Sequence, residues 1–179
     1  MQTYIYDIPV PTDVYRMTYQ VFRPVGAYLS MPITRHTPNT LTLRSGSVIE
    51  SALLARQLAG CDEIVFIGVT VQGADALLQK WIKDSMAQTA ELSGLFSNMV
   101  HEGITYIMGM LHGEALKNGR RMLKRHLSPG IDDFKLDEQK VIYDLLDLQK
   151  LDMHITPDHL LLPEKSAITV SGIMPGEEE

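Results

Sequence analysis

Apolar residues in the first two thirds of the chain follow two patterns, one typical of helices and one of a buried strand. Residues 63–69 are almost wholly apolar, as expected for a strand that is covered on both faces. Before this run, residues 47–60 show helical spacing, and Ser47 and Glu50 have the S-x-x-E spacing of a capping box. Residues 74–86 show helical spacing again. The stretch therefore predicts a helix, a strand and a second helix, an α/β unit.

The rest of the chain predicts a long helical stretch, a shorter helix and a final strand. Residues 90–118 predict one long helix or a helix pair, and the glycines within it indicate close packing or breaks. Asp137 is a candidate N-cap for an amphipathic helix that ends near Lys150. Residues 159–162 and 166–173 predict two strands. The second alternates apolar with small polar residues, so we expect its two faces to differ.

Residues 1–45 give a weaker pattern. Residues 14–22 have the β-branched and aromatic content of a strand, and prolines punctuate the remainder, so we expect one or two strands joined by extended loops. We assign residues 1–45 to the same domain as a core of residues 46–174, and residues 175–179 to an acidic tail. The predicted fold class is α+β, a single domain in which a mixed or antiparallel sheet packs against several helices.

Composition places the chain among ordinary soluble domains. It has 179 residues, 45% hydrophobic and 21% charged, with a formal net charge of −6 that argues against nucleic-acid binding. Residues 117–125 form a local basic exception. Cys61 is the only cysteine, which excludes an intrachain disulfide and favours a reducing cytoplasm. The N-terminus lacks a signal-peptide pattern, and no apolar run reaches the roughly 18 residues of a membrane span. We expect a cytoplasmic protein.

Conventional catalytic motifs are absent from the sequence. There is no P-loop, nucleophile elbow, G-x-G-x-x-G or metal-ligand pattern, and His101 and His112 are not spaced as a helical zinc pair. We therefore assign no catalytic or metal residue, and we expect Cys61 to be structural. Thr70, near Gly73 at the predicted strand end, is a candidate ligand contact because ligands often bind off strand ends near helix N-termini. A plain tight turn is the alternative.

The turn Ser128-Pro129-Gly130 is the other candidate site. Pro129 fixes φ and Gly130 allows backbone geometry closed to other residues, so the turn can bring N–H and C=O groups close to a small ligand. Arg125 and His126 lie just upstream, where a ligand carboxylate or phosphate would find a charged partner. The alternative is a simple turn after a basic helix end, because cations also favour a helix C-terminus.

The motifs of residues 125–174 resemble, in order, the activation domain of cobalamin-dependent methionine synthase. They resemble more closely the small stand-alone proteins that are similar to that domain. The similarity extends over residues 45–174 and is most specific at its C-terminal end. The matching residues are Ser128-Pro129-Gly130, Leu136, Glu138-Gln139, Leu145-Leu146, Thr156, Pro163, Lys165-Ser166 and Val170-Ser171-Gly172-Ile173.

This resemblance implies a function. Domains of the family bind S-adenosylmethionine largely through backbone groups of one segment, with an arginine that meets the ligand carboxylate. They offer the methyl group to a cobalamin carried by a partner, a corrinoid protein or methionine synthase module, with electrons from a flavodoxin-type donor. The protein would supply positioning and electrostatics while the cofactor supplies the chemistry, which leaves open whether the chain is itself an enzyme. No nucleic acid and no membrane enter this expectation.

Carried over to this chain, the implied ligand-binding residues are Arg125, His126, Ser128, Pro129, Gly130 and Ile131. One residue more than is usual in the family separates Arg125 from Ser128. Either Arg125 reaches in from a bulged turn, or His126 takes its place. Ile131 stands where a tyrosine is usual. Three hypotheses follow: a reactivation-type module that binds S-adenosylmethionine, a non-catalytic accessory subunit of a corrinoid methyltransferase that has lost this ligand, and an unrelated small-ligand binder or enzyme that uses residues 70–73.

Overall fold

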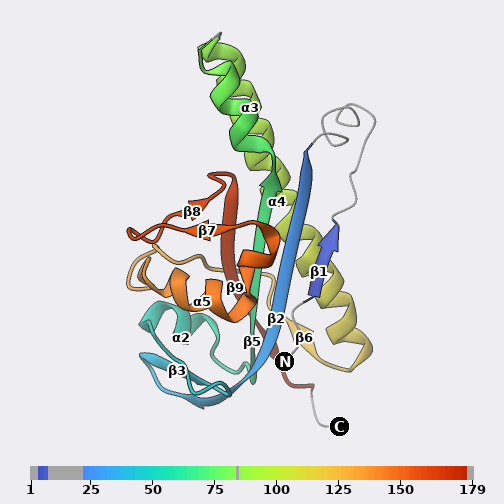
Figure 1. The fold of residues 1–179 in the computed structure, drawn as a ribbon. Coiled ribbons are helices and arrows are strands. Elements are labelled where there is room, and N and C mark those ends of the chain that lie inside the picture. The colour runs from blue at the N-terminus through green and yellow to red at the C-terminus, as the bar shows by residue number, and fades with distance from the viewer. Residues whose placement is uncertain (1–3, 8–21, 84, 177–179) are drawn as a thin grey trace.

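The computed structural model describes residues 4–7, 22–83 and 85–176 (Figure 1). Its strands are β1 (Tyr4–Asp7), β2 (Arg23–His36), β3 (Thr40–Leu43), β4 (Val48–Glu50), β5 (Glu63–Gln72), β6 (Arg121–Met122), β7 (His154–Ile155), β8 (Leu161–Leu162) and β9 (Ser166–Met174). Its helices are α2 (Ala52–Gln57), α3 (Ala74–Trp81), α4 (Met86–Lys117), α5 (Glu138–Leu146) and the short 3-10 helix η1 (Leu148–Leu151).

A single antiparallel sheet organises the described part of the chain. Its strand order is β4-β3-β2-β5-β9-β6, with β1 also paired to β2, and each of these pairings is antiparallel. The short strands β7 and β8 form a separate hairpin. The predicted α+β class, an antiparallel sheet packed against several helices, is confirmed. The α/β unit was correct in element order, but its strand joins an antiparallel sheet.

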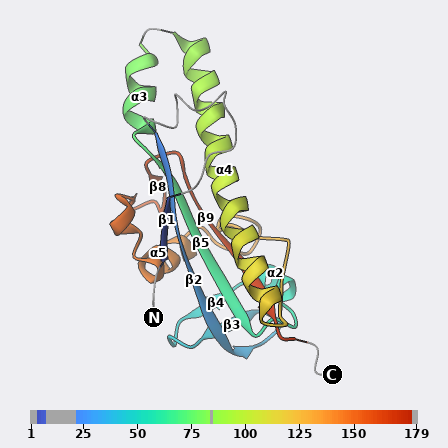
Figure 2. The same cartoon turned by 90° about the vertical axis from the view of Figure 1, so that its right-hand side faces the viewer.

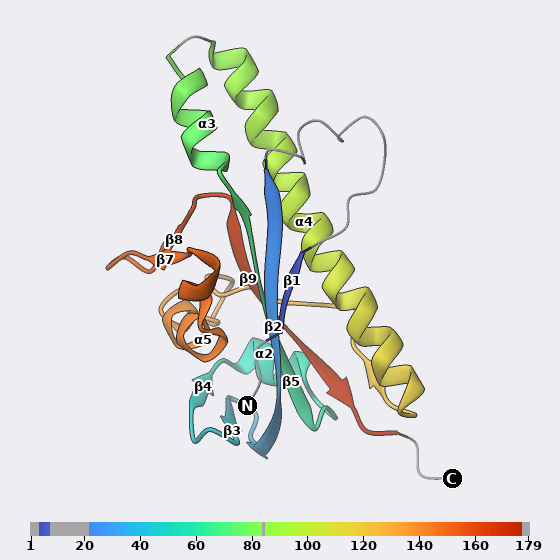
Figure 3. The same ribbon diagram turned by 45° about the vertical axis from the view of Figure 1, so that its right-hand side comes forward.

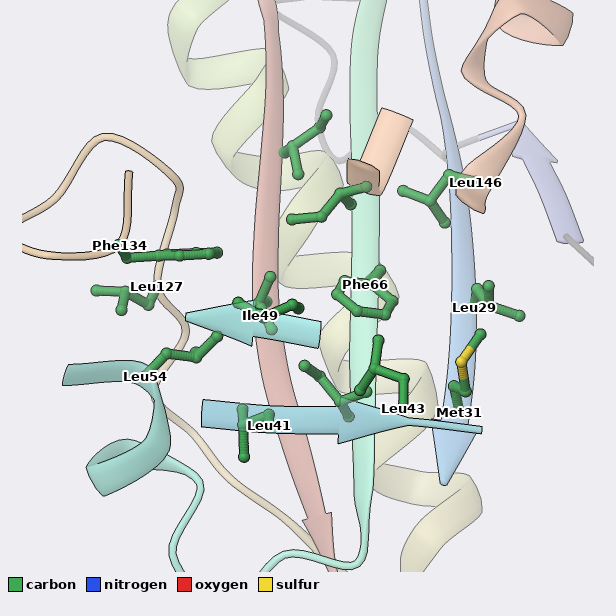
Figure 4. Packing of buried hydrophobic residues seen from close by; sticks show 14 of the residues in the cluster. Leu29, Met31, Leu41, Leu43, Ile49, Leu54, Phe66, Leu127, Phe134 and Leu146 are labelled. Atoms are coloured by element: carbon green, nitrogen blue, oxygen red, sulfur yellow. The ribbon is translucent and has the colours of Figure 1, made fainter. Parts of the chain in front are cut away.

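Both faces of the central strand β5 are covered, as its apolar run predicted. Helix α4 runs along one face, where it packs on Val65 and Ile67 (Figure 2). On the other face Phe66 lies in a cluster with residues of β2, β3, α2, α5 and η1 (Figure 4). Gly26 and Gly68 let α4 and η1 come close to the sheet, since a Cβ added at either glycine would lie 2.7 Å from Ile107 or Leu148.

Strand β2 is the element that the sequence pattern represents least well. It extends over 14 residues and pairs with β5 from Arg23 to Pro32. Its two prolines, Pro24 and Pro32, lie near the ends of that pairing, where a missing N–H costs least. The strand predicted over residues 14–22 falls, except for Phe22, outside the described residues.

The helix start predicted at Ser47 is wrong. Residues 48–50 form β4, in which Ile49 is fully buried and paired with Leu41. The N-cap is Ser51, whose side-chain oxygen accepts a hydrogen bond from the Leu54 N–H at 3.0 Å. Burial of Ile49 in the sheet outweighs the weak local capping signal, because a capping box contributes only about 1 kcal/mol.

Helix α4 is one continuous helix of 32 residues, about 48 Å long. Gly94, Gly109 and Gly113 have open space where a Cβ would lie, so these glycines mark neither a break nor close packing. Buried residues of α4 begin at Phe96, and the helix before this point forms a hairpin with α3 that projects beyond the sheet (Figure 3). None of the helices described is long and apolar enough to cross a bilayer.

Candidate functional site

The segment that leads to the Ser128 turn is held along the edge of β9. The Leu123 N–H donates to Gly172 O at 2.9 Å, and Leu127 and Val170 exchange two backbone hydrogen bonds of 2.9 and 2.8 Å. Residues 124–126 therefore lie opposite the single residue Ser171, as a bulge. The alternation predicted for β9 supplies the polar groups that support this bulge.

Two buried hydroxyls of β9 bind the carbonyl groups of the bulged segment. The Ser171 hydroxyl lies within donating distance of two carbonyl oxygens, Leu123 at 3.2 Å and Arg125 at 2.9 Å. The Thr169 hydroxyl lies 3.2 Å from Leu127 O. Both β9 side chains are fully buried. The small polar face of β9 thus fixes the path of the backbone that enters the turn.

The turn itself is anchored by a backbone hydrogen bond to Phe134, which follows it and is buried in the core. Gly130 has φ +93°, the left-handed region that favours glycine, and its N–H donates to Phe134 O at 2.7 Å. Phe134 is fully buried and lies with Leu127 and Leu54 at one edge of the core cluster (Figure 4). Because the Gly130 N–H already has a protein acceptor, it is not among the groups that the turn offers to a ligand.

Arg125 and His126 lie on different sides of the bulged segment. His126 has its Nδ1 2.8 Å from Thr169 Oγ1, and partial burial, together with the nearby charge of His101 on α4, lowers its pKa below the ordinary value. Arg125 instead lines a groove beside α2, on the opposite side. The two residues that the sequence offered as alternative partners for a carboxylate are therefore not interchangeable, since each faces a different surface.

The groove beside α2, here called the α2 groove, has a volume of about 670 Å³. Its lining residues are Leu53, Arg56 and Gln57 of α2, and Leu123, Lys124 and Arg125 of the bulged segment. Among the described residues, its three cationic side chains form no ion pair. Sequence reasoning found Arg125 but missed Arg56 and Gln57, because only the tertiary fold brings α2 beside residues 123–125.

Asp133 joins the turn to α2. Its carboxylate accepts hydrogen bonds from the Ser51 hydroxyl at 2.7 Å and from the N–H groups of Ala52 and Leu53 at 2.6 and 3.1 Å. The hydrogen bond from Ser51, followed by those from the two N–H groups, lowers the pKa of Asp133 despite some desolvation. An acidic residue five places after Ser128 carried no signal of this role, because its partners are 80 or more residues away.

The remaining residues that the sequence predicted for the site lie either at the turn or far from it. Ser128 is half-buried, Pro129 is buried, and Ile131 is 48% exposed beside them. Thr70 lies within β5 and not beyond its end, fully buried, with its hydroxyl 2.7 Å from that of Ser166. Since Ser166 pairs with Thr70 and lies four residues before Val170, Thr70 is about 13 Å along the sheet from the turn.

Comparison with known proteins finds a structural likeness without a sequence match. No family model and no curated protein matches this chain. Among solved structures, it is similar to the crystal structure of the MetH reactivation domain bound to AdoHcy, with a TM-score of 0.67 and 14% sequence identity. The likeness covers 90% of this chain and 62% of the other, so the chain spans about three-fifths of that structure's length. The described chain therefore has a fold similar to that of the MetH reactivation domain.

Proposed function

We propose that this chain is a reactivation-type module that binds S-adenosylmethionine at the Ser128-Pro129-Gly130 turn. It would present the ligand's methyl group to a corrinoid held by a partner protein, a corrinoid methyltransferase such as methionine synthase. One observation carries the proposal: the fold is similar to that of a domain crystallised with AdoHcy, which is S-adenosylmethionine without its methyl group. The turn that resembles the family motif follows Leu127, which pairs with Val170 of β9, and its Gly130 is exposed.

The residues of the turn fit such a ligand in part. Gly130 holds a left-handed conformation that presents bare backbone, and the exposed side chain of Ile131 offers apolar surface beside it. His126 is a hydrogen-bonding group whose lowered pKa keeps it neutral near pH 7, so it does not repel a sulfonium cation. These groups would bind and orient the ligand, while the corrinoid supplies the chemistry when bound. Thr70, fully buried, with its hydroxyl 2.7 Å from that of Ser166, is not among the groups that would contact this ligand.

Calorimetric titration of the folded chain with S-adenosylmethionine and with AdoHcy tests the proposal directly. We expect both ligands to bind, because the proposed site contacts groups that they share. Heat of binding that is absent for both ligands at millimolar concentration, with protein shown to be folded by circular dichroism, would reject this function. A second assay adds S-adenosylmethionine and a reductant, or a flavodoxin-type donor, to a cob(II) corrinoid protein and follows the spectrum for methylated corrinoid.

The accessory-subunit hypothesis is favoured by a different observation. The Gly130 N–H is already bound by Phe134, Arg125 faces the α2 groove, and an isoleucine stands at the position of the family's tyrosine. A chain that kept the fold and lost the ligand would have these features. In that case the chain retains a corrinoid protein in a pull-down with purified partner, while titration with S-adenosylmethionine gives no heat.

A further inference from the structure

We propose that the α2 groove is a second binding site, which takes a small ligand with a phosphate group next to an apolar or aromatic group. The proposal does not depend on the function of the Ser128 turn. The volume of the α2 groove, about 670 Å³, lies within the range of about 300–1,000 Å³ that is typical for small-molecule sites. Leu53 and Leu123, both half-buried, supply apolar surface in a groove that is otherwise lined by three cationic side chains and the amide of Gln57.

The charged side chains that line the α2 groove are all cationic. Arg56 comes from α2, whereas Lys124 and Arg125 come from a segment more than sixty residues later, and none of the described residues that line the groove with them is acidic. Arg120 belongs to the same basic segment, residues 117–125, but it forms ion pairs with both Asp62 and Glu63. Cations gathered without a counter-charge repel one another, and a bound anion would relieve this repulsion.

Gln57 lines the same groove with a primary amide, whose free hydrogen-bonding capacity becomes available to a ligand when the side chain rotates. Its side-chain Nε2 is buried and has no hydrogen-bond partner among the described residues. A buried donor without an acceptor is unusual in a folded protein and costs free energy. The two arginines and the lysine are donors only, and the Gln57 amide adds a further donor beside its acceptor oxygen. A phosphate group, with several acceptor oxygens, matches this set.

Both walls of the α2 groove are held in place before any ligand binds. The α2 wall is fixed at its first turn by Asp133, and the opposite wall by the Ser171 hydroxyl, which binds the Leu123 and Arg125 carbonyls. A site whose walls are already ordered loses less conformational entropy on binding. Arg56 near the end of α2 is also favoured by the helix dipole, but this does not account for the two cations that face it.

The same charges distinguish this ligand from S-adenosylmethionine. Three cationic side chains disfavour the positive sulfonium of the methyl donor, whereas they attract a phosphate dianion. We therefore expect the α2 groove and the Ser128 turn to bind different ligands at the same time. Binding of phosphate to the α2 groove should weaken with added salt, because its cations are partly exposed.

The probes are inorganic phosphate and phenyl phosphate, with benzyl alcohol as the uncharged comparison, titrated into the full chain by calorimetry and by amide chemical-shift changes. We expect phenyl phosphate to bind more tightly than inorganic phosphate, and benzyl alcohol not to bind. Arg56→Gln and Lys124→Gln should each weaken phenyl phosphate binding about tenfold, since each removes a charge-assisted hydrogen bond. Arg44→Gln, at an exposed arginine outside the α2 groove, is the matched control and should bind as the wild type does.

Four outcomes would overturn the proposal. The first two are no phosphate binding at about 10 mM with folded protein, and equal affinities of the Arg56 and Arg44 variants for phenyl phosphate. The others are displacement of phenyl phosphate by AdoHcy, and binding of an acidic peptide to a chain that does not bind phenyl phosphate. The last would indicate a protein-docking surface. Failure here leaves the proposed function intact, because titration with S-adenosylmethionine uses a different ligand. Conversely, loss of S-adenosylmethionine binding in a Gly130 variant leaves phenyl phosphate binding unchanged.

Discussion

Asp133, which follows the Ser128 turn, accepts a hydrogen bond from the Ser51 hydroxyl at 2.7 Å, and so joins the turn to the first residues of α2. The same carboxylate accepts the N–H groups of Ala52 and Leu53. The turn and the α2 groove are thus parts of one hydrogen-bonded unit, although the segments that form them are far apart in the sequence.

We expect Asp133→Asn to lower the stability of the chain and to loosen α2. An amide accepts with one oxygen only, so it cannot satisfy Ser51 and both N–H groups as the carboxylate does. Urea unfolding followed by circular dichroism measures the loss. Asp132→Asn, at an exposed neighbour, is the control and should leave the midpoint unchanged. Equal midpoints for the two variants would show that the Asp133 contacts contribute nothing to stability.

The lowered pKa of Asp133 gives a pH dependence with a definite sign. Its ordinary value is 3.8, and the folded value is lower, so the unfolded chain binds the proton more readily. The stabilising contribution is therefore complete above about pH 4 to 5 and is lost as pH falls through the folded pKa. The difference in urea midpoint between wild type and Asp133→Asn should shrink when it is measured at pH 3 instead of pH 6. A difference that is constant over this range would contradict the assignment.

Gly130→Val should weaken S-adenosylmethionine binding more than Arg125→Ala does. Valine at φ +93° is strained by about 1–2 kcal/mol, so the turn would change shape, whereas Arg125 faces the α2 groove. Such strain corresponds to roughly a tenfold loss of affinity by calorimetric titration. A β-carbon at Gly130 would also lie 3.3 Å from Leu136 Cδ1. Equal affinities of the two variants would argue against binding by the backbone of the turn.

Two glycines should respond to alanine in opposite ways. Gly94 lies in α4 with open space around its Cα, so Gly94→Ala should stabilise the protein by about 0.5–1 kcal/mol. Gly26→Ala would put a Cβ 2.7 Å from Ile107 Cδ1 and 3.1 Å from Gly68 O, which should cost about 1–3 kcal/mol. Thermal unfolding compares the two variants with the wild type. Two shifts of the same sign would contradict this packing of α4 on β2.

Cys61 should be inert towards thiol reagents while the chain is folded. Burial, with a smaller effect of the Asp62 charge, raises the pKa of its thiol to about 11. At pH 8 about 0.1% of the thiol is then the reactive thiolate, and the side chain is only 9% exposed. The rate of reaction with a chromogenic disulfide should rise sharply in urea. Rapid modification of the folded chain at pH 8 would contradict this environment.

The sequence pattern predicted those parts of the fold whose local signal agrees with their tertiary role. The apolar run of β5 and the alternation of β9 are examples, because burial on one or both faces determines both composition and structure. Helix α5 begins directly after Asp137, as predicted, although the Asp137 side chain makes no capping hydrogen bond. The resemblance named the turn and V-S-G-I as separate matching segments, and the pairing of Leu127 with Val170, which brings them side by side, was not predicted.

Other parts depend on contacts that the sequence does not display. Strand β2 contains two prolines and a glycine, and only its partner β5 makes it a central strand. Ser47 and Glu50 have the spacing of a helix start, but Ile49 between them is needed in the core. The α2 groove combines residues 53–57 with residues 123–125, and no pattern within either segment indicates the other. Local sequence propensity does not predict the structure of these segments, because burial against residues that are distant in the sequence determines it.

The length of α4 divides the molecule into parts of unequal stability. A strand of ten residues spans about 33 Å, whereas α4 is about 15 Å longer, and the part of α4 before Phe96 contains none of its fully buried residues and forms the hairpin with α3. Amide hydrogens of the helix from Met99 onward should exchange only through global unfolding, because Met99, Ile104 and Ile107 lie in the core. Those of the projecting hairpin should exchange through local opening, so the hairpin can rearrange at low free-energy cost while the sheet that carries the turn stays folded.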